Sequence, residues 1–138
     1  MTTVGEFMTT RLVTMDANDT LTAAAQEMRD SAIGDVIVTD GDDVVGIVTD
    51  RDITVRAVAE QMDPASTPLR QITTSDVVTV SQYDDAVAAA DLMRTYGVRR
   101  LPVLEDGRLI GLVSIGDLAV EREPQSVLAD ISADDPNN

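Results

Sequence analysis

Two short motifs combine a hydroxyl group with a carboxylate three residues later, Thr49-x-x-Asp52 and Ser114-x-x-Asp117. Each follows an apolar run, so we expect both at the turn from a strand into a helix. The hydroxyl and the unpaired N–H groups of a helix start favour a phosphate there, while the carboxylate is able to accept both hydroxyls of a ribose. The same spacing is also that of a capping box, which stabilises a helix start without a ligand. The two interpretations are compatible, because the hydroxyl can cap the helix until a ligand arrives.

The cations that a phosphate needs near these motifs are all arginines, because the chain contains no lysine. Arg99 and Arg100 enter an apolar run together. Successive side chains of a strand point to opposite faces, so at most one of the two is expected to face a ligand. Arg51 and Arg56 follow the first motif and are further candidates, although surface arginines commonly pair with nearby carboxylates instead.

The composition removes several classes of function. With 10 Lys+Arg, 25 Asp+Glu and no His, the 138 residues carry a formal net charge of −15. This charge disfavours nucleic acid and anionic membranes as partners. Without His or Cys, the usual zinc sites, thiol nucleophiles and imidazole bases are ruled out. No apolar run approaches the ~20 residues of a membrane span, so we expect a soluble, cytoplasmic protein.

The sequence repeats itself, without a gap, at an offset of 65 residues. The matched pairs include Thr14 and Thr79, Ala24 and Ala89, Met28 and Met93, Val38 and Val103, Gly46 and Gly111, and Asp52 and Asp117. Two copies of one module therefore make up almost the whole chain.

Each copy predicts the same order of elements, β-α-β-β-α. The expected elements are short strands at 12–14 and 77–80, Ala-rich helices capped by Asp19 and Asp84, hairpins at 36–48 and 101–113, and second helices that open at Thr49 and Ser114. We place repeat one at 4–56, a linker at 57–68, repeat two at 69–121 and an acidic, partly disordered tail at 122–138. The fold class is therefore α+β, with two tandem repeats related by pseudo-two-fold symmetry and sheets packed against helices.

With this order, and with the segments Gly46–Ile53 and Gly97–Val103, the chain resembles the cystathionine-beta-synthase (CBS) domain family, and its two copies resemble one Bateman module. Within the family, Met1–Thr3, Leu21–Gln26 and Asp50–Ile53 are similar to the small bacterial proteins of the hypoxic-response type. The resemblance covers essentially everything except the tail.

The resemblance implies a regulatory protein rather than an enzyme, with no obligatory cofactor. CBS pairs bind adenine nucleotides or related ligands, such as AMP, ADP, ATP or S-adenosyl compounds, in clefts between their repeats, and they commonly dimerise. We therefore expect an adenosine-containing ligand, a homodimer and a protein partner that responds to the ligand. The dimer is expected to cover apolar helix faces that include Leu21, Ala25 and Met28 or their counterparts in repeat two, with Phe7 beside them.

The resemblance also implies roles for single residues. The ribose-binding carboxylates and the hydroxyls near phosphate are Asp52, Asp117, Thr49 and Ser114. Thr14 and Thr79 correspond to positions whose backbone contacts adenine, although a β-branched residue in a half-buried strand also accounts for them. The other residues implied in ligand binding are Val98, Arg99, Arg100, Pro102 and Arg51.

Repeat one departs from this pattern. Asp35 and Ile37 stand where repeat two has Arg100 and Pro102. A carboxylate near a phosphate repels it by about 1 kcal/mol or more when partly shielded from water. We therefore expect repeat two to be the better nucleotide site.

Two other functions remain open from the sequence. One is a dimeric scaffold that binds no nucleotide, which Asp35 and the missing proline of repeat one favour. The other is a carboxylate-metal hydrolase built on Asp40, Asp42 and Asp43, although the full calcium loop with its closing Glu is absent and an acidic hairpin turn explains these residues.

Overall fold

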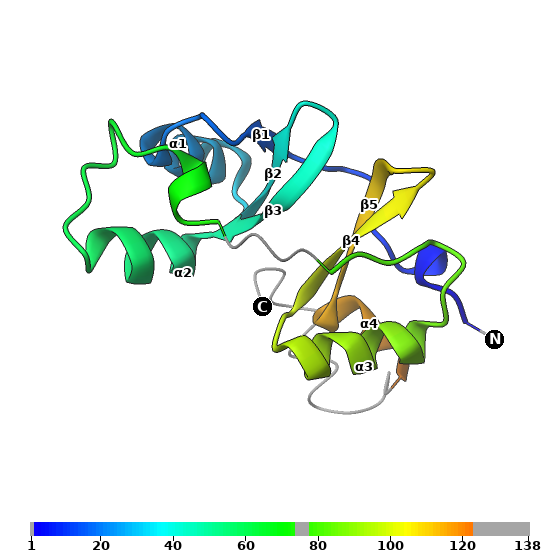
Figure 1. The fold of residues 1–138 in the computed structure, drawn as a ribbon. Coiled ribbons are helices and arrows are strands. Elements are labelled where there is room, and N and C mark those ends of the chain that lie inside the picture. Colours follow the sequence, from blue (N-terminus) through cyan, green and yellow to red (C-terminus); the bar gives the residue numbers. More distant parts are fainter. Residues whose placement is uncertain (1, 74–77, 123–138) are drawn as a thin grey trace. The chain divides into compact units, whose positions relative to one another are not determined.

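The computed structural model describes residues 2–73 and 78–122 (Figure 1). Contacts divide the chain into two units: one comprises residues 13–77, and the other comprises residues 1–12 together with the chain from residue 78 onward. Each unit has its own strands, helices and apolar core. This mixture of helices and strands in two repeated units confirms the α+β class.

The unit of residues 13–77 contains a three-stranded sheet. Its elements are β1 (Thr14–Asp16), α1 (Leu21–Ser31), β2 (Asp35–Asp40), β3 (Asp43–Thr49), α2 (Asp50–Asp52), the π-helix η2 (Ile53–Val58) and the 3₁₀ helix η3 (Leu69–Gln71). The sheet order is β1-β2-β3, with β1 parallel and β3 antiparallel to β2. The order of elements predicted for repeat one is therefore correct.

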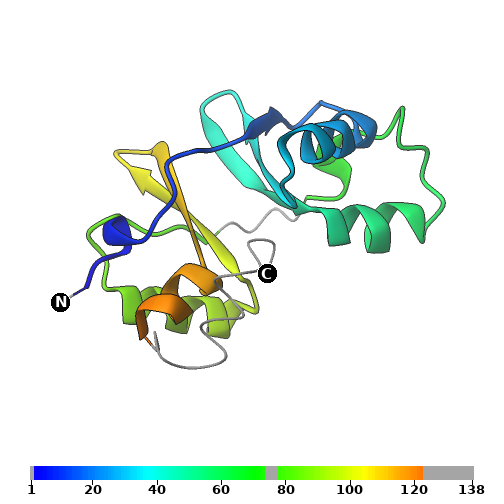
Figure 2. The ribbon, with the colours of Figure 1, turned by 180° about the vertical axis from the view of Figure 1, so that it is seen from behind.

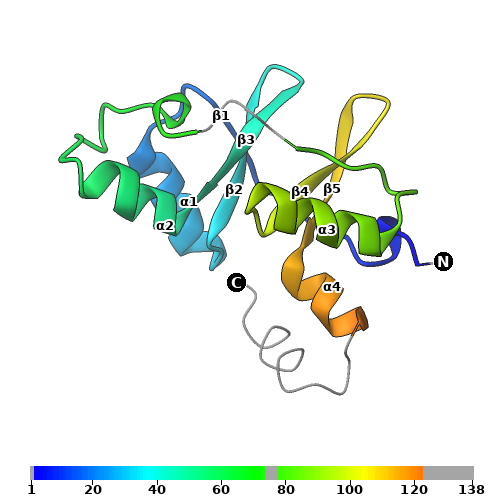
Figure 3. The same cartoon turned by 60° about the horizontal axis from the view of Figure 1, so that its bottom comes forward.

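The other unit is built around an antiparallel hairpin. Its elements are the 3₁₀ helix η1 (Val4–Glu6), α3 (Ala86–Tyr96), β4 (Arg100–Glu105), β5 (Arg108–Ser114) and α4 (Ile115–Arg122). Helix α3 contacts β4 and α4, and α4 contacts β5 (Figure 3). Of the strand expected at 77–80, the described part makes a single parallel bridge from Val80 to Val103, and residue 77 lies outside the described residues.

The first helix of each repeat begins one residue later than the sequence predicts. Thr20 is the N-cap of α1 and its hydroxyl accepts a hydrogen bond from the Ala23 N–H at 3.1 Å. Asp85 caps α3 in the same way through the Val87 N–H, at 3.2 Å. Asp19, predicted as a cap, instead closes the preceding turn by accepting from the Asp16 N–H at 3.0 Å. The predictions of Asp19 and Asp84 as caps are wrong because both carboxylates bond backward along the chain.

Helix α1 turns its apolar face into the core. Leu21 is 0% exposed and Met28 is 7% exposed, and both belong to the core cluster with residues of β2 and β3. The expectation that Leu21 and Met28 form an exposed dimer face is therefore wrong, and of the three predicted helix residues only Ala25 is exposed. Met93 has the matching place in the other core, so the prediction of both methionines as core residues is correct.

Each unit takes a short segment from the start of the other repeat. Val4, in η1, is 0% exposed in the core with α3 and β4, and its N–H donates to the Asp84 carbonyl at 2.9 Å. Leu69, in η3, is 0% exposed in the core with α1 and β2, and its N–H donates to the Asp19 carbonyl at 2.8 Å. Figure 2 shows the N-terminal turn beside the unit that contains α3 and β5. The packing units therefore have different boundaries from the sequence repeats.

The segments outside the repeats are only partly described. The predicted linker, 57–68, starts inside η2, and its Ala57 and Thr67 are buried. The predicted tail, 122–138, lies outside the described residues except for Arg122.

The C-caps of α1 and α3 offer a matched test of backbone strain. Ala32 ends α1 in the left-handed region, at φ 54° and ψ 46°, where Gly97 ends α3 at φ 66° and ψ 31°. A Cβ is disfavoured there, so Ala32→Gly is expected to raise the free energy of unfolding of its unit by about 0.5–1 kcal/mol. Gly97→Ala, where a new Cβ meets no heavy atom within 4 Å, is expected to lower it by about 1 kcal/mol. Denaturant unfolding of the two variants measures both effects, and a loss of stability in Ala32→Gly contradicts this account of the cap.

Candidate functional site

The first motif forms a closed turn between β3 and α2. The Asp52 N–H donates to the Thr49 hydroxyl at 3.1 Å, and the Thr49 N–H donates to Oδ2 of Asp52 at 2.9 Å. The next N–H, of Asp50, donates to the Gly34 carbonyl at 3.0 Å, which ties the turn to the start of β2. The capping interpretation of Thr49-x-x-Asp52 is therefore correct.

The second motif has the same geometry between β5 and α4. The Asp117 N–H donates to the Ser114 hydroxyl at 3.1 Å, and the Ser114 N–H donates to Oδ2 of Asp117 at 3.0 Å. The Ile115 N–H donates to the Arg99 carbonyl at 2.8 Å. In both repeats the cap uses Oδ2 of the carboxylate and leaves Oδ1 outside it, and both aspartates are half-buried.

Opposite charges stand beside the two hydroxyls. In the antiparallel register, Asp35 of β2 pairs with Thr49, whereas Arg100 of β4 pairs with Ser114. Directly opposed residues of an antiparallel pair share one face of the sheet and lie about 5 Å apart at their Cβ atoms. The structure therefore confirms that Asp35 and Arg100 occupy equivalent places, opposite Thr49 and Ser114 in their hairpins.

The other residues predicted for repeat two are distributed over the hairpin. Arg99 is exposed and Val98 is 38% exposed, just before β4. Pro102 is buried, and its carbonyl accepts from the Val80 N–H at 3.0 Å. Thr79, like Thr14 of β1, is exposed rather than half-buried. The local turn Ser114–Asp117 and its neighbour Arg100 are thus the predicted residues that the strand register brings together.

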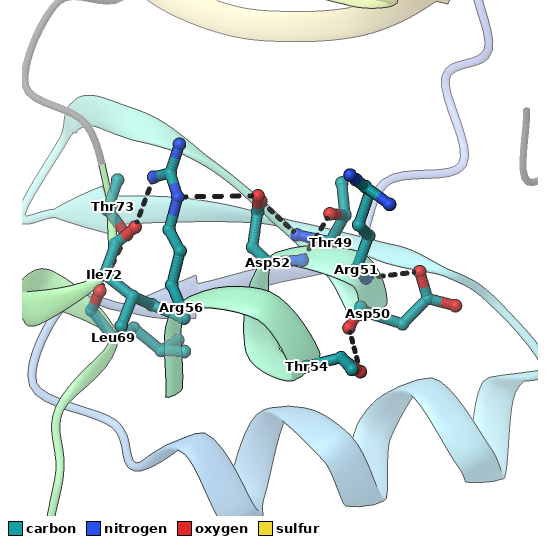
Figure 4. A network of polar contacts seen from close by, with 9 residues as sticks. All are labelled: Thr49, Asp50, Arg51, Asp52, Thr54, Arg56, Leu69, Ile72 and Thr73. Carbon is teal, nitrogen blue, oxygen red and sulfur yellow. Dashed lines mark hydrogen bonds and ion pairs between the residues drawn. The ribbon is translucent and has the colours of Figure 1, made fainter. Parts of the chain in front are cut away.

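Of the two arginines near the first motif, Arg56 is the one beside the carboxylate (Figure 4). Its Nε lies 4.0 Å from Oδ1 of Asp52, one turn earlier, and its Nη1 donates to the Ile72 carbonyl at 2.9 Å. Arg51 is exposed, and its N–H donates to Oδ1 of Asp50 at 2.8 Å. The i, i+4 spacing of Asp52 and Arg56 could have predicted their ion pair from the sequence. No sequence pattern indicated the hydrogen bond from Arg56 to the Ile72 carbonyl.

The acidic hairpin turn of repeat one shows an ion pair. Asp40 lies at the end of β2, and its Oδ2 is 3.4 Å from Nη2 of Arg70. Within the described ranges 2–73 and 78–122, no three His, Cys, Asp or Glu side chains gather as a metal site would require. Within the same ranges, no helix is long and apolar enough to cross a membrane.

Comparison with known sequences agrees with the repeat. The sequence model of the CBS domain matches residues 4–59 and 69–123. The chain belongs to the CBS domain family. Tandem CBS domains are generally regulatory ligand-binding modules, and this chain is such a tandem.

Two bacterial relatives match most of this CBS pair. CBS domain-containing protein YhcV of Bacillus subtilis is 33% identical over 122 residues, 88% of this chain and 86% of that protein. Hypoxic response protein 1 of Mycobacterium tuberculosis is 33% identical over 120 residues, 86% of this chain and 84% of that protein. The similarity to the hypoxic-response type is therefore confirmed, and neither relative is named as an enzyme.

Solved structures show the same fold. A signal-transduction protein with CBS domains from Burkholderia ambifaria has a TM-score of 0.77 at 35% identity, over 85% of this chain and 86% of that one. Hypoxic response protein I, solved with two coordinated zinc ions, has a TM-score of 0.78 at 31% identity, over 88% of this chain and 99% of that one. This CBS pair has no His and no Cys with which to bind zinc in the usual way.

Proposed function

We propose that this CBS pair is a cytoplasmic regulatory protein that binds an adenosine-containing nucleotide, such as AMP, ADP, ATP or an S-adenosyl compound. A protein partner then responds to whether the nucleotide is bound. The observation that carries the proposal is the turn formed by Ser114 and Asp117, with its counterpart at Thr49 and Asp52. Each turn offers its hydroxyl, at the start of a helix, to phosphate. Each also offers Oδ1 of an aspartate, outside the cap, to ribose hydroxyls.

Repeat two is the better site for an anionic ligand. Arg100 lies opposite Ser114 in the sheet, whereas Asp35 lies opposite Thr49. Near a protein surface, one charge at short range changes the energy of a phosphate by about 1 kcal/mol or more. AMP, ADP and ATP are therefore expected to prefer the turn of repeat two.

Titration calorimetry with AMP, ADP, ATP, NAD and S-adenosylmethionine tests the proposal. Micromolar binding of any of them supports it, and mass spectrometry of the denatured protein then identifies what co-purifies. Binding weaker than millimolar for all five ligands would overturn it.

A dimeric scaffold without nucleotide binding is the second candidate. The carboxylate of Asp35 beside Thr49 favours it, as does Ile37 at the place of Pro102. A crystal structure of the protein purified without added ligand separates the two functions. Side chains that fill the turns at Asp52 and Asp117 support the scaffold, and a co-purified nucleotide there excludes it.

We also propose that the chain forms a homodimer through exposed apolar side chains outside the two cores. Val55 and Val58 of η2 are 48% and 63% exposed, Tyr83 in the turn before α3 is 70% exposed, and Val87 of α3 is 47% exposed. Light scattering is expected to show a dimer at micromolar concentration, and Val58→Asp to shift it toward the monomer at least about tenfold, since the change places a charge in an apolar contact. Ser31→Asp, which adds the same charge at an exposed site of α1, is the control.

The dimer is expected to be looser at low ionic strength, because each chain carries a net charge of −15. A wild-type monomer at moderate salt contradicts the proposed dimer. An effect of Ser31→Asp equal to that of Val58→Asp contradicts the assignment of the surface.

A further inference from the structure

Repeat one contains a chain of contacts that starts at its ligand-binding turn. Oδ2 of Asp52 belongs to the cap, and Oδ1 faces Nε of Arg56 at 4.0 Å. The same guanidinium donates through Nη1 to the Ile72 carbonyl at 2.9 Å. Figure 4 shows the Arg56 side chain between the carboxylate and the backbone of Ile72. The side chain of Arg56 therefore contacts both Asp52, which is the proposed ribose-binding carboxylate, and Ile72, which lies 16 residues further along the chain.

The segment that Arg56 contacts is a compact turn, Leu69–Thr73. Leu69 is 0% exposed and Ile72 is 4% exposed. The Leu69 carbonyl accepts from the N–H groups of Ile72 and Thr73, both at 3.1 Å, and from the Thr73 hydroxyl at 2.7 Å. These contacts make the turn a single small body inside the unit of residues 13–77, with the Ile72 carbonyl as the atom that Arg56 holds.

The helix that carries Arg56 differs from its counterpart in repeat two. Residues Ile53–Val58 form a π-helix, with bonds such as that from the Ala59 N–H to the Thr54 carbonyl at 3.0 Å, whereas α4 is a regular α-helix. Widened turns of this kind often mark functional positions. At the offset of 65 residues, the sequence has Glu121 in the place of Arg56. A cation at this position is therefore a property of repeat one.

We propose that Arg56 is a positioning residue that links occupancy of the repeat-one turn to the order of the turn Leu69–Thr73; this inference rests on the proposed nucleotide binding. Ribose hydroxyls that donate to the Asp52 carboxylate fix its orientation. A fixed carboxylate holds the guanidinium of Arg56, and the guanidinium holds the Ile72 carbonyl. Because coupling is reciprocal, an ordered turn also favours ligand binding at Asp52.

Nucleotide binding to repeat one tests the link directly. Asp117→Ala serves as the background, so that AMP binding reports on repeat one, and NMR titration covers affinities into the millimolar range. In that background Arg56→Met, which keeps the apolar stem but no donor, is expected to weaken AMP binding three- to tenfold. Arg56→Lys restores the charge but offers a single ammonium, so it is expected to recover part of the affinity.

Hydrogen exchange of the amides of Leu69–Thr73 distinguishes the proposed link from a purely structural role of Arg56, because a structural role would not make their protection depend on AMP. AMP at saturation is expected to slow these amides at least threefold more than the amides of α1, and Arg56→Met is expected to abolish this extra protection at equal saturation. Equal protection with and without Arg56, equal affinities of the Arg56→Met and Arg56→Lys variants, or no AMP binding in the Asp117→Ala background would each overturn the link. Absence of AMP binding to the wild-type chain is a different result, since it removes the proposed function itself.

Discussion

Asp117→Ala is expected to weaken AMP binding at the turn of repeat two by about 10- to 150-fold, because hydrogen bonds to a charged group are worth about 1.5–3 kcal/mol. The change removes both carboxylate oxygens from the turn of repeat two, including Oδ1, which the Ser114 cap leaves outside. Titration calorimetry of the wild-type chain and the variant, at the same salt concentration and in the same oligomeric state, measures the ratio of their AMP affinities. Unchanged AMP affinity would remove the basis for the proposed site.

The cap requires its own control, since Asp117→Ala also leaves the Ser114 N–H without its acceptor. Losing a cap costs about 1 kcal/mol of stability, so thermal unfolding must accompany the binding measurement. Asp117→Asn keeps an oxygen for the Ser114 N–H but removes the charge, and it is expected to lower AMP affinity with little loss of stability. Asp52→Ala is the matched variant in repeat one, where Asp35 lies beside the turn, and its effect on AMP binding is expected to be smaller.

Local features of the fold could be predicted from the sequence. The capping turn at Thr49 and Asp52 spans three residues, so its geometry follows from a short pattern. The N-caps shifted by one residue because Asp19 and Thr20 are both good caps, and a competing turn bond, made to Asp16, decided between them. Two adjacent polar residues before an apolar pattern therefore predict that a helix starts there, but they do not predict which residue is its first.

Tertiary features could not be predicted in the same way. The apolar period of α1 identified the face of Leu21 and Met28, but a period does not say whether a sheet or a second chain covers that face. The opposed charges of Asp35 and Arg100 were predictable, because the two repeats align without a gap. The bond from Arg56 to Ile72 was not, because nothing in the sequence pairs a side chain with a backbone carbonyl 16 residues away.

The largest expected effect on stability comes from the packing of each unit against the first turn of the other sequence repeat. Leu69 opens the second sequence repeat but is fully buried in the core with α1, β2 and β3. Leu69→Ala is therefore expected to lower the free energy of unfolding of the unit of residues 13–77 by about 3 kcal/mol, the usual cost of a buried leucine replaced by alanine. Hydrogen exchange is expected to accelerate about 100-fold in α1 and β2 and far less in α3 and β4.

Val4→Ala is the matched variant, because Val4 has the equivalent place in the core with α3, β4 and β5. It is expected to cost less, about 2 kcal/mol, since fewer atoms are removed, and to accelerate exchange in α3 and β4 instead. This pattern, with Leu69→Ala acting on α1 and β2 and Val4→Ala on α3 and β4, follows only if each unit takes its leading turn from the other repeat. If Leu69→Ala accelerated α3 and β4 while Val4→Ala accelerated α1 and β2, each repeat would pack on its own leading turn, and the link from Arg56 to Leu69–Thr73 would lose its structural basis.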